Sequence, residues 1–163
     1  MKPMLNLNDL MQERLREMYD GEKQFAKSLN KIHEKTSSVS LQKHIKEYEL
    51  ICEDQIIRLK QVFNLIFAQK RGEHSLAMQT LIEEAQKIIE RCMEPAVIDA
   101  AIISALQRII HFKIASYGAI SNYSNTLGLF EEAGILHTNL EMEKRTDKKL
   151  AELAEYMVNM EAV

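Results

Sequence analysis

The sequence predicts an all-α chain that buries its core in the manner of a four-helix bundle, with one additional short crossover helix. Its 163 residues contain only 5 Gly and 2 Pro, too few turn-forming residues for a sheet with many connections. Apolar residues also recur at alternating spacings of three and four, which is the period of one helix face. The length suits a single domain, which we expect to span residues 1–163.

The first long helix is predicted over about residues 7–35. One position on its inward face is occupied by an acid, Glu22. The Ser- and Thr-rich segment 36–40 follows, and such side chains cap helices and compete for backbone hydrogen bonds. A turn is therefore expected there. The predicted inward face consists of Leu15, Met18, Glu22, Phe25, Leu29 and Ile32.

A second long helix is predicted over about residues 41–66 and ends before the polar loop 69–73. Its apolar stripe passes through either Ile51 or Cys52, since both fit the spacing of three and four. Gln55 continues the stripe one turn later. The inward face of this helix is thus predicted to be apolar with one amide.

The segment between the second and third long helices is predicted to form the short crossover. Ser75 is a candidate N-cap, and the helix should end near Cys92 because Pro95 cannot continue it. A connection from about residue 72 to residue 95 is long enough to carry the chain along the bundle. Ferritin-like folds use one such crossover.

Two further long helices complete the predicted bundle. Pro95 suits the first turn of the third, and Asn125 with Gly128 should stop it. The last helix should begin near Phe130. The predicted inward faces are Ile102, Ile103, Leu106, Ile110, Ile114 and Tyr117 for the third helix, and Ile135, Asn139, Met142, Thr146, Leu150, Leu153 and Met157 for the last.

Composition disfavours several classes of protein. A formal net charge of −3, with Lys and Arg interspersed among Glu, gives no basic surface for nucleic acid. The sequence shows no apolar run long enough to span a membrane and no secretory leader. Cys52 and Cys92 stand apart, which favours neither a disulfide framework nor a zinc site. We expect a cytoplasmic protein in a reducing compartment, with no nucleic-acid or membrane partner.

The segment Tyr19-Asp20-Gly21-Glu22-Lys23-Gln24, with further short segments as far as Thr146-Asp147, resembles the YciE/YciF family of ferritin-like, stress-associated bacterial proteins. The segment Tyr19–Gln24 is similar to the signature of the family's first helix, and further matching pieces follow in the same order and spacing across nearly the whole chain. These pieces are Ala77-Met78, Leu81–Ala85, Asp99–Ala101, His111, Ile114–Gly118, Gly128, Glu143-Lys144 and Thr146-Asp147.

The resemblance implies a domain that is often dimeric and carries a carboxylate-rich dinuclear metal site between its four helices. Glu22 matches the carboxylate of the first helix. Ile51, Ile110, Lys113 and Met142 stand where further carboxylates are expected. Because the three apolar members of this set, Ile51, Ile110 and Met142, all lie on the predicted stripes, we expect the centre of the bundle to be repacked as a hydrophobic core without metal.

The role of Glu22 is left open between a surviving ligand, a buried acid paired with a base, and a carboxylate that reaches solvent. Lys113 is its natural partner because it carries the kind of charge that a metal would supply, although a solvated lysine is equally consistent. Cys52 lies near a lost ligand position and is interpreted as a buried, unreactive thiol, with a soft-metal ligand as the alternative.

The leading hypothesis is a non-catalytic stress-family protein that acts as a homodimer or through an unknown protein partner and has no cofactor. Glu49, Glu53 and Glu143 are interpreted as members of solvated faces, and His111 as a structural or surface histidine. The alternative is an iron- or manganese-binding oxidoreductase or metal store with a relocated site. Its ligands would be Glu22, Glu53, His111 and Glu143.

Overall fold

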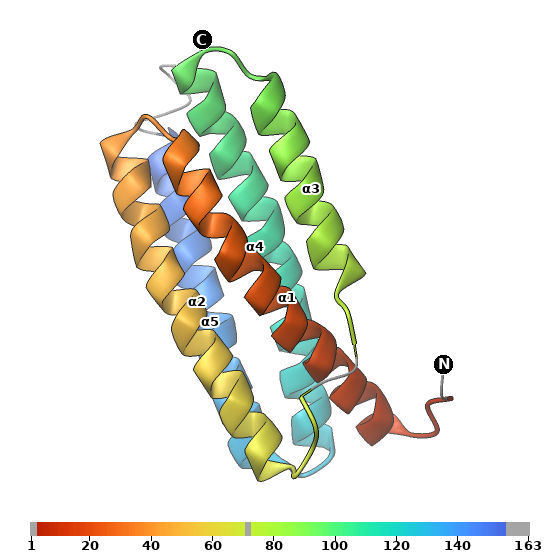
Figure 1. Ribbon diagram of the computed structural model, residues 1–163. Coiled ribbons are helices and arrows are strands. Elements are labelled where there is room, and N and C mark those ends of the chain that lie inside the picture. The colour runs from red at the N-terminus through yellow and green to blue at the C-terminus, as the bar shows by residue number, and fades with distance from the viewer. Residues whose placement is uncertain (1–2, 71–72, 156–163) are drawn as a thin grey trace.

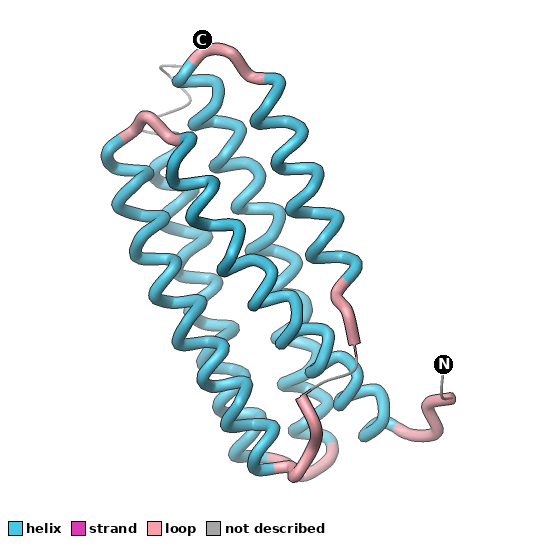
Figure 2. Tube along the Cα trace, viewed as in Figure 1, coloured by secondary structure: helices cyan, strands magenta, loops and turns pink. Residues whose placement is uncertain are grey.

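The computed structural model describes residues 3–70 and 73–155, and every regular element within them is helical (Figure 2). The prediction of an all-helical chain is confirmed, and the predicted boundaries lie close to the observed ones. Met157, which the sequence placed on the inward face of the last helix, lies outside the described residues. The helices are α1 (Leu7–Lys35), α2 (Val39–Leu65), α3 (Leu76–Arg91), α4 (Pro95–Thr126) and α5 (Phe130–Leu153).

The four longest helices pack side by side. The neighbouring pairs are α1 with α2, α2 with α5, α5 with α4, and α4 with α1. The shorter α3 lies against α1 and α4 and carries the chain back along the bundle, so that α4 runs opposite to α1 (Figure 1). Within the described residues, no helix is both long enough and apolar enough to cross a membrane.

Local residues mark the helix ends, and those at Ser38, Ser75 and Gly128 lie where the sequence predicts a boundary. Asn6 caps α1 by accepting a hydrogen bond of 2.9 Å from the Asp9 amide, and Ser38 and Ser75 cap α2 and α3 in the same way. Gly128 follows α4 with φ of 78°, a left-handed conformation that glycine adopts without strain. These local signals explain why the helices begin and end where they do.

The turn between α1 and α2 is held by Asp99 on α4. Its carboxylate accepts hydrogen bonds from the Ser37 amide at 3.0 Å, the Ser37 hydroxyl at 2.6 Å, the Ser38 amide at 2.9 Å and the Thr36 hydroxyl. Asp99 is almost completely buried, and these donors replace the water that it loses. The contact fixes the end of the α1–α2 hairpin against α4.

The apolar core is divided into two clusters, one toward each end of the bundle. One cluster contains Phe25 of α1 and Ile110 of α4, and the other contains Met18 of α1 and Tyr117 of α4. On both α1 and α4 these two positions are seven residues apart, which is about two helical turns. The level between the two clusters is therefore shared by all four helices and is where a central site would lie.

Candidate functional site

The level between the two apolar clusters is occupied by polar side chains, one or more from each of the four long helices. Glu22 comes from α1, Gln55 from α2, Lys113 from α4 and Glu143 from α5. All four have no exposed surface. Glu22, Gln55 and Lys113 each lie between buried residues of the two apolar clusters on their helices, and Glu143 lies between the buried Leu140 and Thr146. The helical period therefore places all four on inward faces. We call these residues, with Tyr48, Cys52 and Tyr117, the central cluster.

The Lys113 ammonium lies at the middle of the central cluster. Its Nζ is 2.8 Å from Glu143 Oε1 and 3.1 Å from Glu22 Oε2. It donates hydrogen bonds to Gln55 Oε1 at 2.9 Å and to the Tyr48 hydroxyl at 3.1 Å. The Tyr48 ring also lies beneath the ammonium, with its centroid 4.9 Å from Nζ. The lysine thus bridges α1, α2 and α5.

The two carboxylates receive further hydrogen bonds from the helices beside them. Glu22 Oε1 accepts a bond of 2.6 Å from the Tyr117 hydroxyl. Glu143 accepts one of 2.6 Å from the Tyr48 hydroxyl and another of 2.6 Å from Gln55 Nε2. Glu22 Oε2 receives no hydrogen bond from the described residues, so its contact with Lys113 is an ion pair alone. Glu22 is therefore the less fully satisfied of the two acids.

The central cluster contains two acids and one base, which leaves it one negative charge in excess when all three are ionised. Burial raises the pKa of Glu22 to about 7, the attraction of Lys113 opposes this increase, and the charge of Glu143 adds to it. Burial alone would lower the pKa of Lys113, but its acidic neighbours outweigh this effect and raise it. The lysine stays charged, and a Glu22 pKa of about 7 means that this acid takes up a proton, and relieves the excess charge, only as the pH falls below neutrality.

The thiol and phenols of the central cluster are held in their protonated forms. Burial raises the pKa of Cys52, Tyr48 and Tyr117 well above their ordinary values. Cys52 is a free, buried cysteine whose Sγ lies 3.7 Å from Lys113 Nζ. A protonated thiol is neither a good nucleophile nor a good metal ligand. These groups act as hydrogen-bond donors and packing residues.

The dinuclear metal site that the resemblance implies does not fit this set of side chains. In ferritin-like metal proteins two helices each supply a Glu, and the other two each supply a Glu-x-x-His pair. The same pattern of positions is present here, but two of the six residues are carboxylates, none is histidine, and one is a lysine. The six residues are Glu22 on α1, Cys52 and Gln55 on α2, Lys113 on α4, and Glu143 and Thr146 on α5.

A cation of high charge needs several carboxylate or imidazole ligands. The ammonium of Lys113 instead occupies the space between the two remaining acids. More widely, the described residues contain no group of three or more His, Cys, Asp or Glu side chains arranged to hold a metal ion.

The four ligands of the alternative hypothesis do not come together. Glu22 and Glu143 both contact Lys113 in the core, whereas Glu53 is exposed on α2. His111 is also on the surface, where its Nε2 lies 3.2 Å from a carboxylate oxygen of Asp147. The interpretation of Glu22 as a buried acid paired with Lys113 is confirmed.

Two interpretations of the sequence are wrong. Glu143 was assigned to a solvated face, but it is completely buried, and its neighbour Met142 is the residue at the edge of the core. The centre was predicted to be hydrophobic, but only Ile110 of the three substituted positions is fully buried. Ile51 and Met142 are partly exposed and line a surface cavity between α2 and α5.

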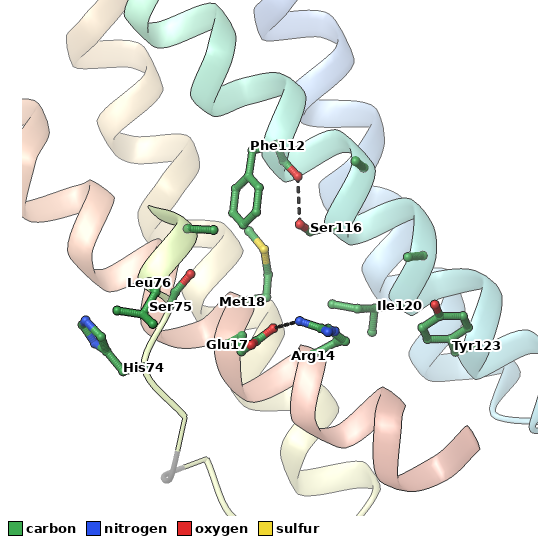
Figure 3. Close-up of a pocket in the computed structure, with 13 residues that line it drawn as sticks. Arg14, Glu17, Met18, His74, Ser75, Leu76, Phe112, Ser116, Ile120 and Tyr123 are labelled. Carbon is green, nitrogen blue, oxygen red and sulfur yellow. Dashed lines mark hydrogen bonds and ion pairs between the residues drawn. The ribbon is translucent and has the colours of Figure 1, made fainter. Parts of the chain in front are cut away.

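A cleft of about 390 Å³ lies on the surface between α1, α4 and the beginning of α3 (Figure 3). Met18 and Phe112 form part of its apolar wall. Its polar groups are largely engaged elsewhere: the Ser116 hydroxyl donates to the Phe112 carbonyl at 2.8 Å, and Arg14 pairs with Glu17 at 2.5 Å. The cleft offers an apolar surface, and the central cluster holds the more distinctive chemistry.

Comparison with known proteins gives a consistent result. Residues 6–163 match the family described as "Domain of unknown function (DUF892)". Protein YciF of Escherichia coli (strain K12) is 36% identical over 160 residues, which cover 98% of this chain and 96% of that protein.

Two solved structures are also similar. The crystal structure of the E. coli stress protein YciF matches with a TM-score of 0.92 and 35% identity, covering 96% of this chain and 99% of that one. YcfI from Rhodopseudomonas palustris matches with a TM-score of 0.90 and 31% identity, covering 92% of this chain and 96% of that one.

Proposed function

Because this chain belongs to the DUF892 family, we propose that it is a non-catalytic, ferritin-like stress protein in which a lysine takes the place of the metal ions. The observation that supports this most is the position of Lys113. Its Nζ lies within 3.1 Å of both Glu22 and Glu143, at the level where all four long helices contribute a polar side chain. An ammonium there supplies the positive charge that two buried acids require.

The surroundings of Lys113 support a structural role rather than a catalytic one. The charged members of the central cluster, Glu22, Lys113 and Glu143, are fully buried, so a substrate has no direct access to them. Its acids accept hydrogen bonds from tyrosines whose raised pKa keeps them protonated. A reactive site needs a group that can gain or lose a proton in contact with substrate. The cluster instead joins the helices to one another.

The experiment that tests this proposal is a metal analysis of the purified protein after exposure to Fe²⁺ or Mn²⁺. We expect no stoichiometric metal in the wild-type protein. A variant with the substitutions Cys52→Glu, Gln55→His, Lys113→Glu and Thr146→His restores the full set of ligands and serves as the positive control. We expect it to bind metal and to be stabilised by it, since its acids repel one another without a cation.

The outcome also separates this proposal from a metal-binding one. Stoichiometric iron or manganese in the wild-type protein would contradict a lysine-filled centre and favour a metal store or oxidoreductase. A matched control is the exposed Lys148, whose replacement by Glu makes the same charge change outside the core. That variant should bind no more metal than the wild type.

We further propose that the protein acts in the cytoplasm through association with a second copy of itself or with another protein. The family resemblance supports this, because a core without accessible reactive groups leaves the surface to carry the function. Sedimentation velocity over a range of protein concentrations tests self-association. If the protein is a monomer at every concentration, self-association is excluded and the proposed partner is a different protein.

A further inference from the structure

A cavity of about 190 Å³ opens between α2 and α5, on the side of these helices that faces away from α1 and α4. Each helix contributes side chains spaced three and four residues apart, so the cavity runs along the groove between two antiparallel helices. Ile51 and Met142, which the sequence placed in the bundle centre, are two of its walls. The central cluster makes no use of either residue.

The lining of this cavity combines an apolar wall with a positive mouth. Ile51, Met142 and the ring of Tyr48 form the apolar part. The Tyr48 ring is fixed from behind, because its hydroxyl donates to Glu143 at 2.6 Å. Arg145 and Lys149 are exposed at the mouth. The wall is therefore preformed, which reduces the entropy lost when a ligand binds.

His44 adds a polar nitrogen to the cavity lining. Its Nε2 is buried and makes no hydrogen bond to any described residue. Burial lowers the pKa of His44, and the nearby charge of Lys149 lowers it further while Glu47 opposes the effect, which favours the neutral form of the ring. A neutral imidazole offers one N–H donor. A buried polar nitrogen of this kind is destabilising unless a water or a ligand pairs with it.

The charge of the lining identifies the ligand's chemistry. Two cations, Arg145 and Lys149, face one acid, Glu47, which lies 3.7 Å from the Lys149 ammonium. This balance favours an anion, and arginine in particular recognises carboxylates through paired hydrogen bonds. The apolar wall favours a hydrocarbon group on the same molecule.

We propose that this cavity binds a small carboxylate that carries an apolar group. The carboxylate would lie at the mouth, between Arg145 and Lys149, and accept a hydrogen bond from His44. The apolar group would pack on Ile51 and Met142. The site shares the Tyr48 ring with the central cluster but none of its charged groups, so the proposal stands whether or not the metal-free centre is correct.

The test uses benzoate as the probe and the full-length protein, observed by NMR of the Met methyl groups and the His rings. We expect saturable shifts at Met142 and His44, and an upward shift in the pKa of His44 when benzoate is bound, because a nearby negative charge favours the imidazolium. Benzyl alcohol has nearly the same shape without the charge. We expect it to bind much more weakly.

Substitutions at the mouth make the test specific. Arg145→Gln and Lys149→Gln should each weaken benzoate binding by about tenfold, as expected when a charge-assisted hydrogen bond is lost. Lys148→Gln removes the same charge from an adjacent exposed position outside the cavity and should leave the affinity unchanged. Circular dichroism confirms that each variant is folded.

Three results would overturn the proposal. The first is an absence of saturable shifts at His44 and Met142 with benzoate. The second is equal affinity for benzyl alcohol, which would remove the role of the charges. The third is unchanged benzoate affinity in both mouth variants, which would place the carboxylate elsewhere.

Discussion

Replacing Lys113 with Met should destabilise the protein strongly, because it removes the charge of the central cluster and keeps most of the side chain's volume. Lys113 Nζ lies 2.8 Å from Glu143 and 3.1 Å from Glu22, and both acids are completely buried. Removing one partner of a buried ion pair costs about 3–5 kcal/mol. Two acids lose their partner here, so the upper part of this range is expected.

The assay is urea denaturation followed by circular dichroism, at one fixed protein concentration so that any self-association contributes equally. With a denaturant dependence of about 1–3 kcal/mol per molar urea, a loss of about 4–5 kcal/mol should lower the midpoint by roughly 1.3–5 M. The free energy of unfolding of an ordinary domain is about 5–15 kcal/mol, so a loss of this size removes a large part of it. Lys148→Met, at an exposed site on α5, should change stability by less than about 0.5 kcal/mol.

A second variant separates the loss of the ion pair from a general packing defect. In Lys113→Met with Glu22→Gln and Glu143→Gln, no charge remains in the centre, and much of the lost stability should return. Lowering the pH should have a similar effect on the single variant, because protonation removes the unpaired charges. A single variant as stable as the wild type above pH 8 would refute the reasoning.

Three further predictions concern other parts of the core. The raised pKa of Glu22, about 7 against an ordinary 4.5, means that its contribution to stability is fully present below pH 4.5 and is lost as the pH rises through 7. As the pH rises between these limits, the free energy of unfolding of the wild type should fall by about 3 kcal/mol relative to that of Glu22→Gln. Urea midpoints that change with pH in the same way in both proteins would contradict this. Ile110→Glu places an acid in a fully buried apolar cluster and should cost a few kcal/mol, about 2–5, in urea denaturation; an unchanged midpoint would count against it. Asp99→Ala removes the acceptor that holds Ser37 and Thr36 and should lower stability by about 1–3 kcal/mol, with faster amide exchange at the α1–α2 turn, and unaltered exchange there would show that the turn does not depend on Asp99.

The fold was predictable from the sequence because its signals are local. Ser38, Ser75, Pro95 and Gly128 mark helix ends through the conformations and hydrogen bonds of single residues. The apolar period then assigns each segment to a helix without reference to any other segment. The all-helical architecture follows from these rules alone.

The central cluster was predicted only in part, for a physical reason. Glu22 interrupts an apolar stripe and was placed on the inward face, with Lys113 named as its natural partner, but a solvent-reaching Glu22 and a solvated Lys113 were left open. On α5, however, Met142 and Glu143 are adjacent and lie within one residue of the stripe. Assigning the apolar residue to the core and the acid to solvent is the ordinary choice. A buried acid becomes stable only through partners on other helices, and the sequence of one helix does not contain them.

A signal for the correct assignment was nevertheless present. Gln55 lies on the stripe of α2, three residues after Cys52, and Thr146 lies three residues after Glu143. Read together with single polar positions on α1 and α4, these i, i+3 pairs reproduce the positions of a dinuclear site. Testing that spacing on each helix would have selected Cys52 over Ile51 and Glu143 over Met142.

The most direct test of a lysine-filled centre is anomalous X-ray scattering from crystals of the wild-type protein soaked in Mn²⁺. The structure predicts no manganese peak between Glu22 and Glu143, with Lys113 Nζ in contact with both carboxylates as it is here. A manganese peak at that position, with the Lys113 side chain displaced from the two acids, would contradict it.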